Sequence, residues 1–195
     1  MKYRIYIVFA ILCSFVLALQ LTGCSMEQSS ASYPMYADED AIINTADIIV
    51  LGEVVKENKA QKININPNKN RTEKEKEDDL VIYTVSDVKV SEVIKGNVKV
   101  GDVIQIKQLG DKDGIGNREV LNNGGYYKKG SQFLFFLASF EDILPGTPYE
   151  TLTPALGQIE INGNKSKVNK ENNIFKDGID KDELVNHIKA KTNKK

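Results

Sequence analysis

The sequence predicts a mainly β protein, a small closed β-barrel with a short N-terminal helix and a C-terminal helix. Three observations predict this class. Short runs of β-branched and aromatic residues alternate with turns rich in Gly, Asp and Asn. One long run, residues 80–96, shifts the phase of its apolar alternation part-way, as a bulged strand that curls around a barrel does. The clearest helical pattern begins at Asp180, near the end of the chain.

The N-terminus has the pattern of a secretory signal. Lys2 and Arg4 precede an apolar run, residues 5–21, that is interrupted only by Ser14 and Gln20. A positive start, an apolar middle and small residues at the end are typical of a signal peptide, here residues 1–23. The apolar run, at about 17 residues, is at the lower limit for a helix that spans a bilayer.

The end of this signal, "LTGC" at residues 21–24, resembles the bacterial lipobox, in which a branched apolar residue and two small residues precede a cysteine. In that family the cysteine sulfur receives a diacylglycerol and the peptide bond before it is cut. The resemblance implies cleavage between Gly23 and Cys24, lipidation of Cys24, and a lipoprotein anchored to the cell membrane on its extracytoplasmic side. The alternative is an uncleaved anchor helix with an incidental cysteine, which also leaves the body facing outward.

Composition limits the class of the remaining chain. The two cysteines are Cys13, inside the signal, and Cys24, so we expect no disulfide in the body. The 26 Lys and Arg residues are balanced by 27 Asp and Glu residues, so no basic excess points to a nucleic-acid partner. Residues 24–37 are polar and Ser-rich and contain Pro34, which predicts a flexible tether before a single domain at residues 38–195.

The first half of this domain begins with a helical turn or two at residues 38–46, with Asp38 as the N-cap. Residues 47–56 are mostly apolar and β-branched, which predicts a buried strand, and Gly52 within them predicts a bulge or bend. Residues 57–79 are polar throughout, and we expect a long mobile loop without regular structure.

Residues 80–96 are expected to form a long second strand. Its apolar alternation changes phase at Ser86 and Asp87, which predicts a β-bulge there. The two apolar sets are Val81, Tyr83 and Val85 before this point, and Val88 and Val90 after it. A turn at Gly101 and Asp102 leads into a third strand.

The second half of the domain contains the most apolar stretch. Residues 111–125 predict a loop, and residues 131–140, which include "FLFFL", predict a central strand with no wet face. Residues 149–161 predict a looser strand pair, and Asn162-Gly163 a hairpin turn. An N-cap at Asp180 and an apolar stripe predict the C-terminal helix; the stripe is Leu184, Val185 and Ile188.

Four features occur in an order that resembles the netrin-like module, which is also found in tissue inhibitors of metalloproteinases. They are Ala46-Asp47 before the first strand, Lys95-Gly96 after the second, the strand at residues 103–106, and the Gly-rich turn and apolar strand at residues 124–137. The resemblance covers about half of the chain, residues 45–138. It implies a five-stranded Greek-key barrel of the OB type with helices packed at one side.

The chain departs from this family in one decisive respect. The inhibitors bind the zinc of their target through an unblocked N-terminal cysteine, whereas the lipobox implies that Cys24 carries lipid and precedes a tether. The inhibitory chemistry is therefore not carried over to any residue. The segment at residues 57–79 matches a long loop that contacts the target in some of those inhibitors.

Few residues suggest chemistry. His187 is the only histidine, so we expect no zinc site of the usual N/S type and no Ser-His-Asp arrangement. Acidic residues 38–40 and 78–79 lie in polar segments, which do not favour a catalytic pair of carboxylates. The segment "DKDGIGN", residues 111–117, matches a calcium loop poorly, and a β-turn is the favoured interpretation. We therefore predict no catalytic residue, no metal and no cofactor.

One segment suggests a contact surface. Tyr126 and Tyr127, next to Lys128 and Lys129, are candidates for an aromatic and basic ligand surface. OB-type barrels bind oligonucleotides or sugars on one sheet face, and glycan is the better expectation outside the membrane. The favoured alternative is that one tyrosine enters the core and that the lysines are solvated.

The sequence thus favours a lipid-anchored, non-enzymatic protein that binds a protein or a wall polymer of the cell envelope. One alternative is inhibition of a secreted protease through residues 57–79. Another is a hydrolase, which requires two carboxylates about 5 to 10 Å apart. A third is a domain that only spaces or stabilises an envelope complex.

Overall fold

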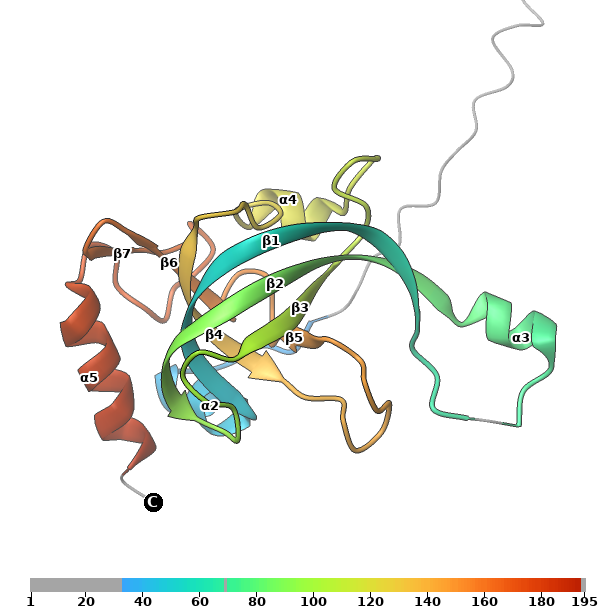
Figure 1. The fold of residues 1–195 in the computed structure, drawn as a ribbon. Coiled ribbons are helices and arrows are strands. Elements are labelled where there is room, and N and C mark those ends of the chain that lie inside the picture. The colour runs from blue at the N-terminus through green and yellow to red at the C-terminus, as the bar shows by residue number, and fades with distance from the viewer. Residues whose placement is uncertain (1–32, 69, 194–195) are drawn as a thin grey trace, which may run out of the picture.

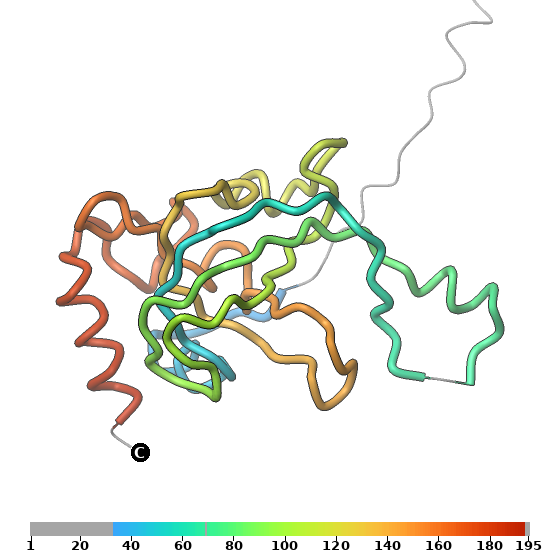
Figure 2. The backbone as a smooth tube through the Cα atoms, viewed as in Figure 1, coloured from blue at the N-terminus to red at the C-terminus, as the bar shows by residue number. Residues whose placement is uncertain are grey.

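A computed structural model describes residues 33–68 and 70–193, and it is mainly β (Figures 1 and 2). The predicted signal, its cleavage after Gly23 and the lipidation of Cys24 lie outside these residues. The elements are, in chain order, α2 (Glu39–Thr45), β1 (Ile48–Asn64), α3 (Glu73–Asp78), β2 (Leu80–Lys95), β3 (Val103–Leu109), α4 (Arg118–Asn122), β4 (Gln132–Ala138), β5 (Tyr149–Thr151), β6 (Gln158–Asn162), β7 (Lys165–Lys167) and α5 (Lys181–Thr192).

Five of these strands close into a barrel. The order is β1-β2-β3-β5-β4, and β4 returns to pair with β1 over residues 132–137 and 48–53. β5 runs parallel to β3, and the other pairs in the ring are antiparallel. β6 and β7 extend the sheet from β4 outside this ring. The prediction of a small closed β-barrel is confirmed.

Strand β4 is the centre of the sheet, as its apolar sequence predicts. It pairs with β1, β5 and β6, and both of its faces are covered. Alternate residues point to opposite sides of a strand. One set faces the barrel interior: Phe133, Phe135 and Leu137. The other set faces an outer layer that also contains residues of α2 and α5: Leu134 and Phe136.

The bulge predicted at Gly52 is confirmed. The register between β1 and β2 shifts between Leu51 and Gly52. A Cβ atom at Gly52 would lie 2.6 Å from Cγ1 of Val88, so the two strands approach here more closely than a side chain allows.

The change of phase in β2 affects its pairing with β1 but not its pairing with β3. Its register with β1 shifts at the predicted point, between Asp87 and Val88, where Val55 of β1 is the extra residue. Its register with β3 is unbroken over residues 84–89. The barrel covers the inner face of β2, where Val88 and Val90 are buried. Other segments cover part of its outer face, where Tyr83 and Val85 are buried but Val81 is partly exposed.

The two flanking helices are fixed at their ends. Asp38 caps α2 by accepting a hydrogen bond from the Ala41 N–H. At the other end of α2, Lys95 Nζ donates to the carbonyls of Ile43 and Asn44, at 3.0 Å each, and to that of Ala46. An ammonium group suits the negative end of a helix dipole. The C-terminal helix is confirmed, with Asp180 as its N-cap and three residues buried: Leu184, Val185 and Ile188.

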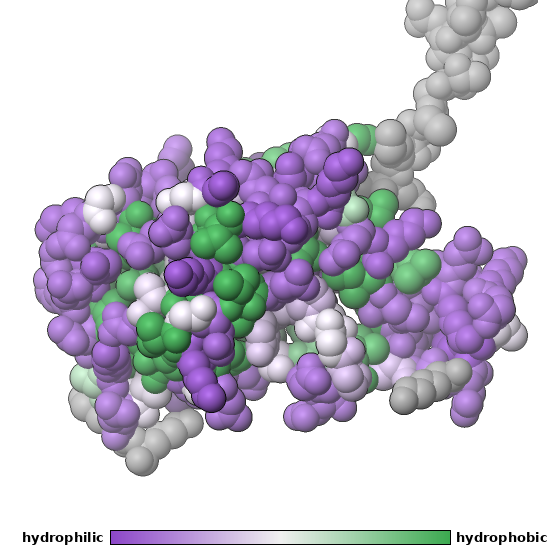
Figure 3. Space-filling view, in the orientation of Figure 1, coloured by the Kyte–Doolittle hydropathy of each residue, from purple (hydrophilic) through white to green (hydrophobic). Residues whose placement is uncertain are grey.

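Residues 57–79 differ from the structureless loop that we expected. Residues 57–64 continue β1, and Glu73–Asp78 form α3 behind a capping box of Thr72 and Glu75. The polar strand is stabilised by backbone pairing with β2 rather than by burial, from Ala60 opposite Thr84 to Asn64 opposite Leu80. The paired ends of β1 and β2, with α3, form an arm that projects from the barrel (Figure 1). Hydrophilic residues cover the end of this arm (Figure 3).

Two smaller differences affect the surface. The loop expected at residues 111–125 contains the helix α4, capped by Asn117. The last part of the predicted tether also contacts the barrel: Tyr36 packs against the outer apolar layer, and Tyr33 is half-buried near Glu150. Two residues in the described part of the predicted tether, Tyr33 and Tyr36, are therefore held against the barrel.

Candidate functional site

The candidate site is a groove of about 550 Å³ at one end of the barrel. Its walls come from β4, β6, β7, the residues just after β7, and the segment between α4 and β4. Register places three of its side chains in one row, because Phe133 is opposite Glu160 and Glu160 is opposite Lys167. We call this hollow the mouth groove.

A network of buried amides and one phenol lies behind the lining of the groove and includes two of its lining residues, Asn123 and Gln158. The Tyr127 hydroxyl donates to Gln158 Oε1, and Gln158 Nε2 donates to the carbonyl of Asn123 at 3.2 Å. The Tyr127 N–H donates to Gln108 Oε1 at 2.9 Å, and Gln108 Nε2 donates to the carbonyl of Gly125 at 3.1 Å. These bonds tie the segment after α4 to β3 and β6, so one wall of the groove has a fixed position.

Tyr127 itself belongs to the core. Its ring is 5.1 Å from that of Phe133 and 5.4 Å from that of Phe135, between centroids, and 2% of the residue is exposed. Burial is the main cause that raises the pKa of Tyr127, so the hydroxyl remains a neutral hydrogen-bond donor.

Residues 126–129 therefore do not form the single ligand surface that was predicted. Tyr127 points inward, and the Tyr126 hydroxyl donates to the carbonyl of Leu109 at 2.8 Å. Lys128 and Lys129 are exposed, as the alternative interpretation predicts. Tyr126 and Lys128 line the mouth groove, whereas the Lys129 N–H donates to a carboxylate oxygen of the arm.

The polar lining of the groove is mostly amide and ammonium. Lys128, Lys167 and Lys170 line it together with side-chain amides that include Asn122, Asn169 and Gln158. Among the described residues that line the groove, Glu160 is the only carboxylate, and its Oε2 is 2.8 Å from Lys167 Nζ. This lining can bind a polar ligand, but it offers no pair of carboxylates for acid and base catalysis.

One buried acceptor in the lining is unsatisfied. Asn123 is 3% exposed and its Nδ2 donates to the carbonyl of Glu119, but its Oδ1 has no hydrogen-bond partner among the described residues. A buried acceptor without a partner costs free energy, so Asn123 Oδ1 is a candidate to accept a hydrogen bond from a ligand or a water molecule.

Sequence reasoning missed the β6–β7 half of the groove. Its residues are separated from residues 126–129 by about thirty positions and join them only through the sheet. A signal was present, because the alternation in "QIEI", residues 158–161, places Gln158 and Glu160 on one face of a strand.

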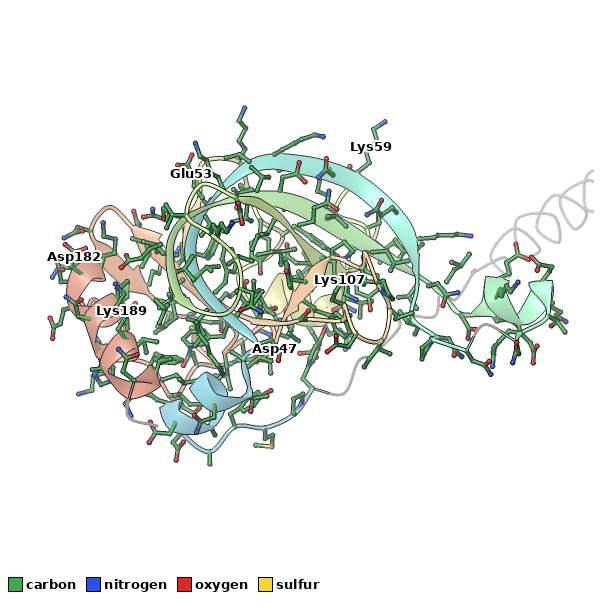
Figure 4. The ribbon with its side chains drawn as sticks, turned by 60° about the horizontal axis from the view of Figure 1, so that its bottom comes forward. Asp47, Glu53, Lys59, Lys107, Asp182 and Lys189 are labelled. Carbon is green, nitrogen blue, oxygen red and sulfur yellow. The ribbon has the colours of Figure 1, made fainter. Side chains whose placement is uncertain are left out.

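A second cluster of charged side chains lies on the face of β3 that points away from the barrel interior, where other segments of the chain bury it. Lys107 is 3% exposed, and its Nζ is 3.4 Å from Glu150 Oε2. The same ammonium group is 4.1 Å from the ring centroid of Phe140 and 4.7 Å from that of Tyr83. Burial lowers the pKa of Lys107, and the Glu150 carboxylate opposes this effect. Figure 4 shows Lys107 within the body, in contrast to Lys59, which points outward from β1.

The other residues considered for chemistry have structural roles. His187 Nε2 is 2.8 Å from Glu39 Oε2, so it joins α5 to α2. Asp111 Oδ1 accepts a hydrogen bond from the Asp113 N–H in a local turn. In residues 33–68 and 70–193, no three His, Cys, Asp or Glu side chains are gathered closely enough to hold a metal ion. None of the helices in the described part of the chain is long and apolar enough to span a membrane.

No protein-family model, no curated protein and no solved structure matches the chain. The function must therefore be argued from the mouth groove and from the signals in the sequence.

Proposed function

We propose that the body is an OB-type barrel of the netrin-like kind. The strand order β1-β2-β3-β5-β4 with β3 parallel to β5 supports this assignment. Residues that carry the resemblance to the netrin-like module also have structural roles in this barrel. Asp47 Oδ2 accepts a hydrogen bond from the Ser139 N–H at 2.8 Å, and Ala46 is buried. Gly96 has a φ of +103° and lies where a Cβ atom would be 2.9 Å from the carbonyl oxygen of Asp47.

The proposed function is non-enzymatic binding at the cell envelope, on the outer side of the membrane. Lipid on Cys24 is the proposed anchor, and the mouth groove is the proposed binding site for an extended wall polymer. The observation that carries this proposal is the groove itself, about 550 Å³ in volume, with two aromatic side chains and several amides in its lining. Concave sites with a few fixed polar groups are where ligands bind.

The groove can be tested by filling it. In the variant Asn169→Trp, a large side chain enters the groove from the segment after β7, where Asn169 lines it. The matched control is Lys59→Trp, on the exposed arm (Figure 4). We expect the detergent-purified, full-length Lys59→Trp protein to bind wall polymer as the wild type does, and the Asn169→Trp protein to lose this binding. Equal retention by both variants would refute binding in the groove.

The anchor has a separate test. Cys24→Ser removes the sulfur that would carry lipid, so the variant should be released from the membrane or keep an uncut signal. A processed Cys24→Ser protein that still partitions into detergent would refute lipid as the anchor.

The arm supports a second candidate function. The outer part of the arm, with α3 at its end, projects from the barrel (Figure 1), as a segment that enters the cleft of a secreted protease must. Replacing residues 65–79 by a two-residue turn should abolish protease inhibition and leave polymer binding unchanged. An intact inhibitory activity in this variant would exclude the arm.

A further inference from the structure

The mouth groove has a positive charge that the chain as a whole lacks. The chain has a net charge of −1, whereas three lysines and one glutamate line the groove. Lys167 neutralises that glutamate, since its Nζ is 2.8 Å from Glu160 Oε2. Within the described residues, Lys128 and Lys170 make no salt bridge, so their ammonium groups are available to a ligand.

The two available lysines come from different elements. Lys128 belongs to the segment between α4 and β4, and Lys170 follows β7. Both line the same groove, so one ligand lying in it can contact both ammonium groups. The hollow is concave, which fits a polymer chain better than a flat bilayer surface.

The uncharged part of the lining suits the backbone of such a polymer. Phe133 is half-buried and lines the groove, so part of its ring is open to a ligand. Side-chain amides donate and accept hydrogen bonds, which suits hydroxyl groups of sugars and polyols. A ligand that carried only anionic groups would not use the ring of Phe133 or these amides.

We propose that the mouth groove binds an anionic wall polymer, in which phosphate or carboxylate groups repeat along a sugar or polyol backbone. Lys128 and Lys170 pair with successive anionic groups, and Phe133 and the amides contact the backbone between them. This inference rests on the proposed binding function and adds to it the charge of the ligand.

The experiment compares three polymers on detergent-purified full-length protein: polyglycerol phosphate, polygalacturonate and neutral amylose. The variant is Lys128→Ala with Lys170→Ala, and the matched control is Lys59→Ala with Lys62→Ala on the arm. Each lost ammonium contact should weaken binding of an anionic polymer about threefold to fivefold, so the double variant should lose about tenfold or more. Added salt should weaken wild-type binding and have less effect on the variant.

The polymers separate the outcomes. Binding of polyglycerol phosphate alone identifies phosphate as the anionic group, binding of polygalacturonate alone identifies carboxylate, and loss of either in the groove variant supports the inference. Equal, salt-independent binding of amylose by wild type and variant would overturn the inference and leave the proposed function standing. If the Asn169→Trp variant loses no binding to any wall polymer, the proposed function itself fails. The assay is repeated with phosphatidylglycerol vesicles in place of detergent. If the protein then no longer binds polymer, the groove binds lipid head groups and the inference is overturned.

Discussion

Replacing Glu150 by glutamine should destabilise the barrel although it keeps the size of the side chain. The change removes the carboxylate 3.4 Å from Lys107 Nζ and leaves an ammonium group that is 3% exposed. At an effective dielectric constant of about 20, two unit charges at this distance attract each other by about 5 kcal/mol. Part of this attraction offsets the cost of taking both charges out of water.

The size of the loss follows from what remains around Lys107. Breaking a buried pair costs about 3 to 5 kcal/mol when the remaining charge has no compensation. Here the rings of Phe140 and Tyr83, at 4.1 and 4.7 Å, still face the ammonium group. Each cation–π contact offsets about 1 kcal/mol. We therefore expect Glu150→Gln to lower the free energy of unfolding by about 2 kcal/mol.

A double-mutant cycle by urea unfolding tests this reasoning. Lys107→Met should cost only about 1 kcal/mol, because Glu150 is partly exposed and can be hydrated. The double variant Lys107→Met/Glu150→Gln should also lose only about 1 kcal/mol, which gives a coupling energy of about 2 kcal/mol. Lys76→Ala, which breaks an exposed ion pair on α3, is the control and should not change the midpoint. A double variant that loses the full sum of the two single losses would refute the coupling.

Three further predictions concern single positions. Lys95→Met removes the donor to the last carbonyls of α2 and should cost about 1 to 2 kcal/mol in urea unfolding, whereas Lys95→Arg should cost less. Gly52→Ala places a Cβ atom 2.6 Å from Val88 Cγ1 and should lower the melting temperature, with a loss of about 2 kcal/mol. Burial, assisted by Glu150, raises the pKa of Tyr33 from 10.0 to about 12. Because the folded protein holds this proton longer than the unfolded chain, the contribution of Tyr33 to stability is complete below pH 10 and is lost as the pH rises to about 12. Tyr33→Phe should reduce this alkaline loss and remove one late-titrating tyrosine from the ultraviolet titration.

The elements that the sequence predicts well are those with dense local signals. β4 has five apolar residues in succession, and α5 has a cap and an apolar stripe within nine residues, Asp180 to Ile188. The β6–β7 hairpin has its Asn162-Gly163 turn, where Gly163 has a φ of +63°. Each signal is short and does not depend on a distant partner, so local chemistry was sufficient.

The elements that escaped prediction depend on partners far away in the sequence. Residues 57–64 are mostly polar and form a strand only because residues 80–86 of β2 pair with them. The capping box of Thr72 and Glu75 was visible in the sequence, but no apolar run followed it to mark a helix. At the candidate site, Tyr127 enters the core whereas Tyr126 lines the groove. Successive side chains of an extended chain point to opposite sides, and the surface predicted at residues 126–129 did not take this alternation into account.

The position of the mouth groove on β4 and β6 has a consequence for binding. Phe133 and Glu160 are direct backbone partners on β4 and β6, and apolar layers lie on both sides of β4. Their geometry is therefore fixed by folding, and a ligand does not have to order them. Lys128 and Lys170 lie outside the strands and keep the freedom of exposed side chains. For the anionic polymer that we propose as ligand, the rigid part of the groove would position the backbone, and the flexible side chains of Lys128 and Lys170 would adjust to the spacing of its charges.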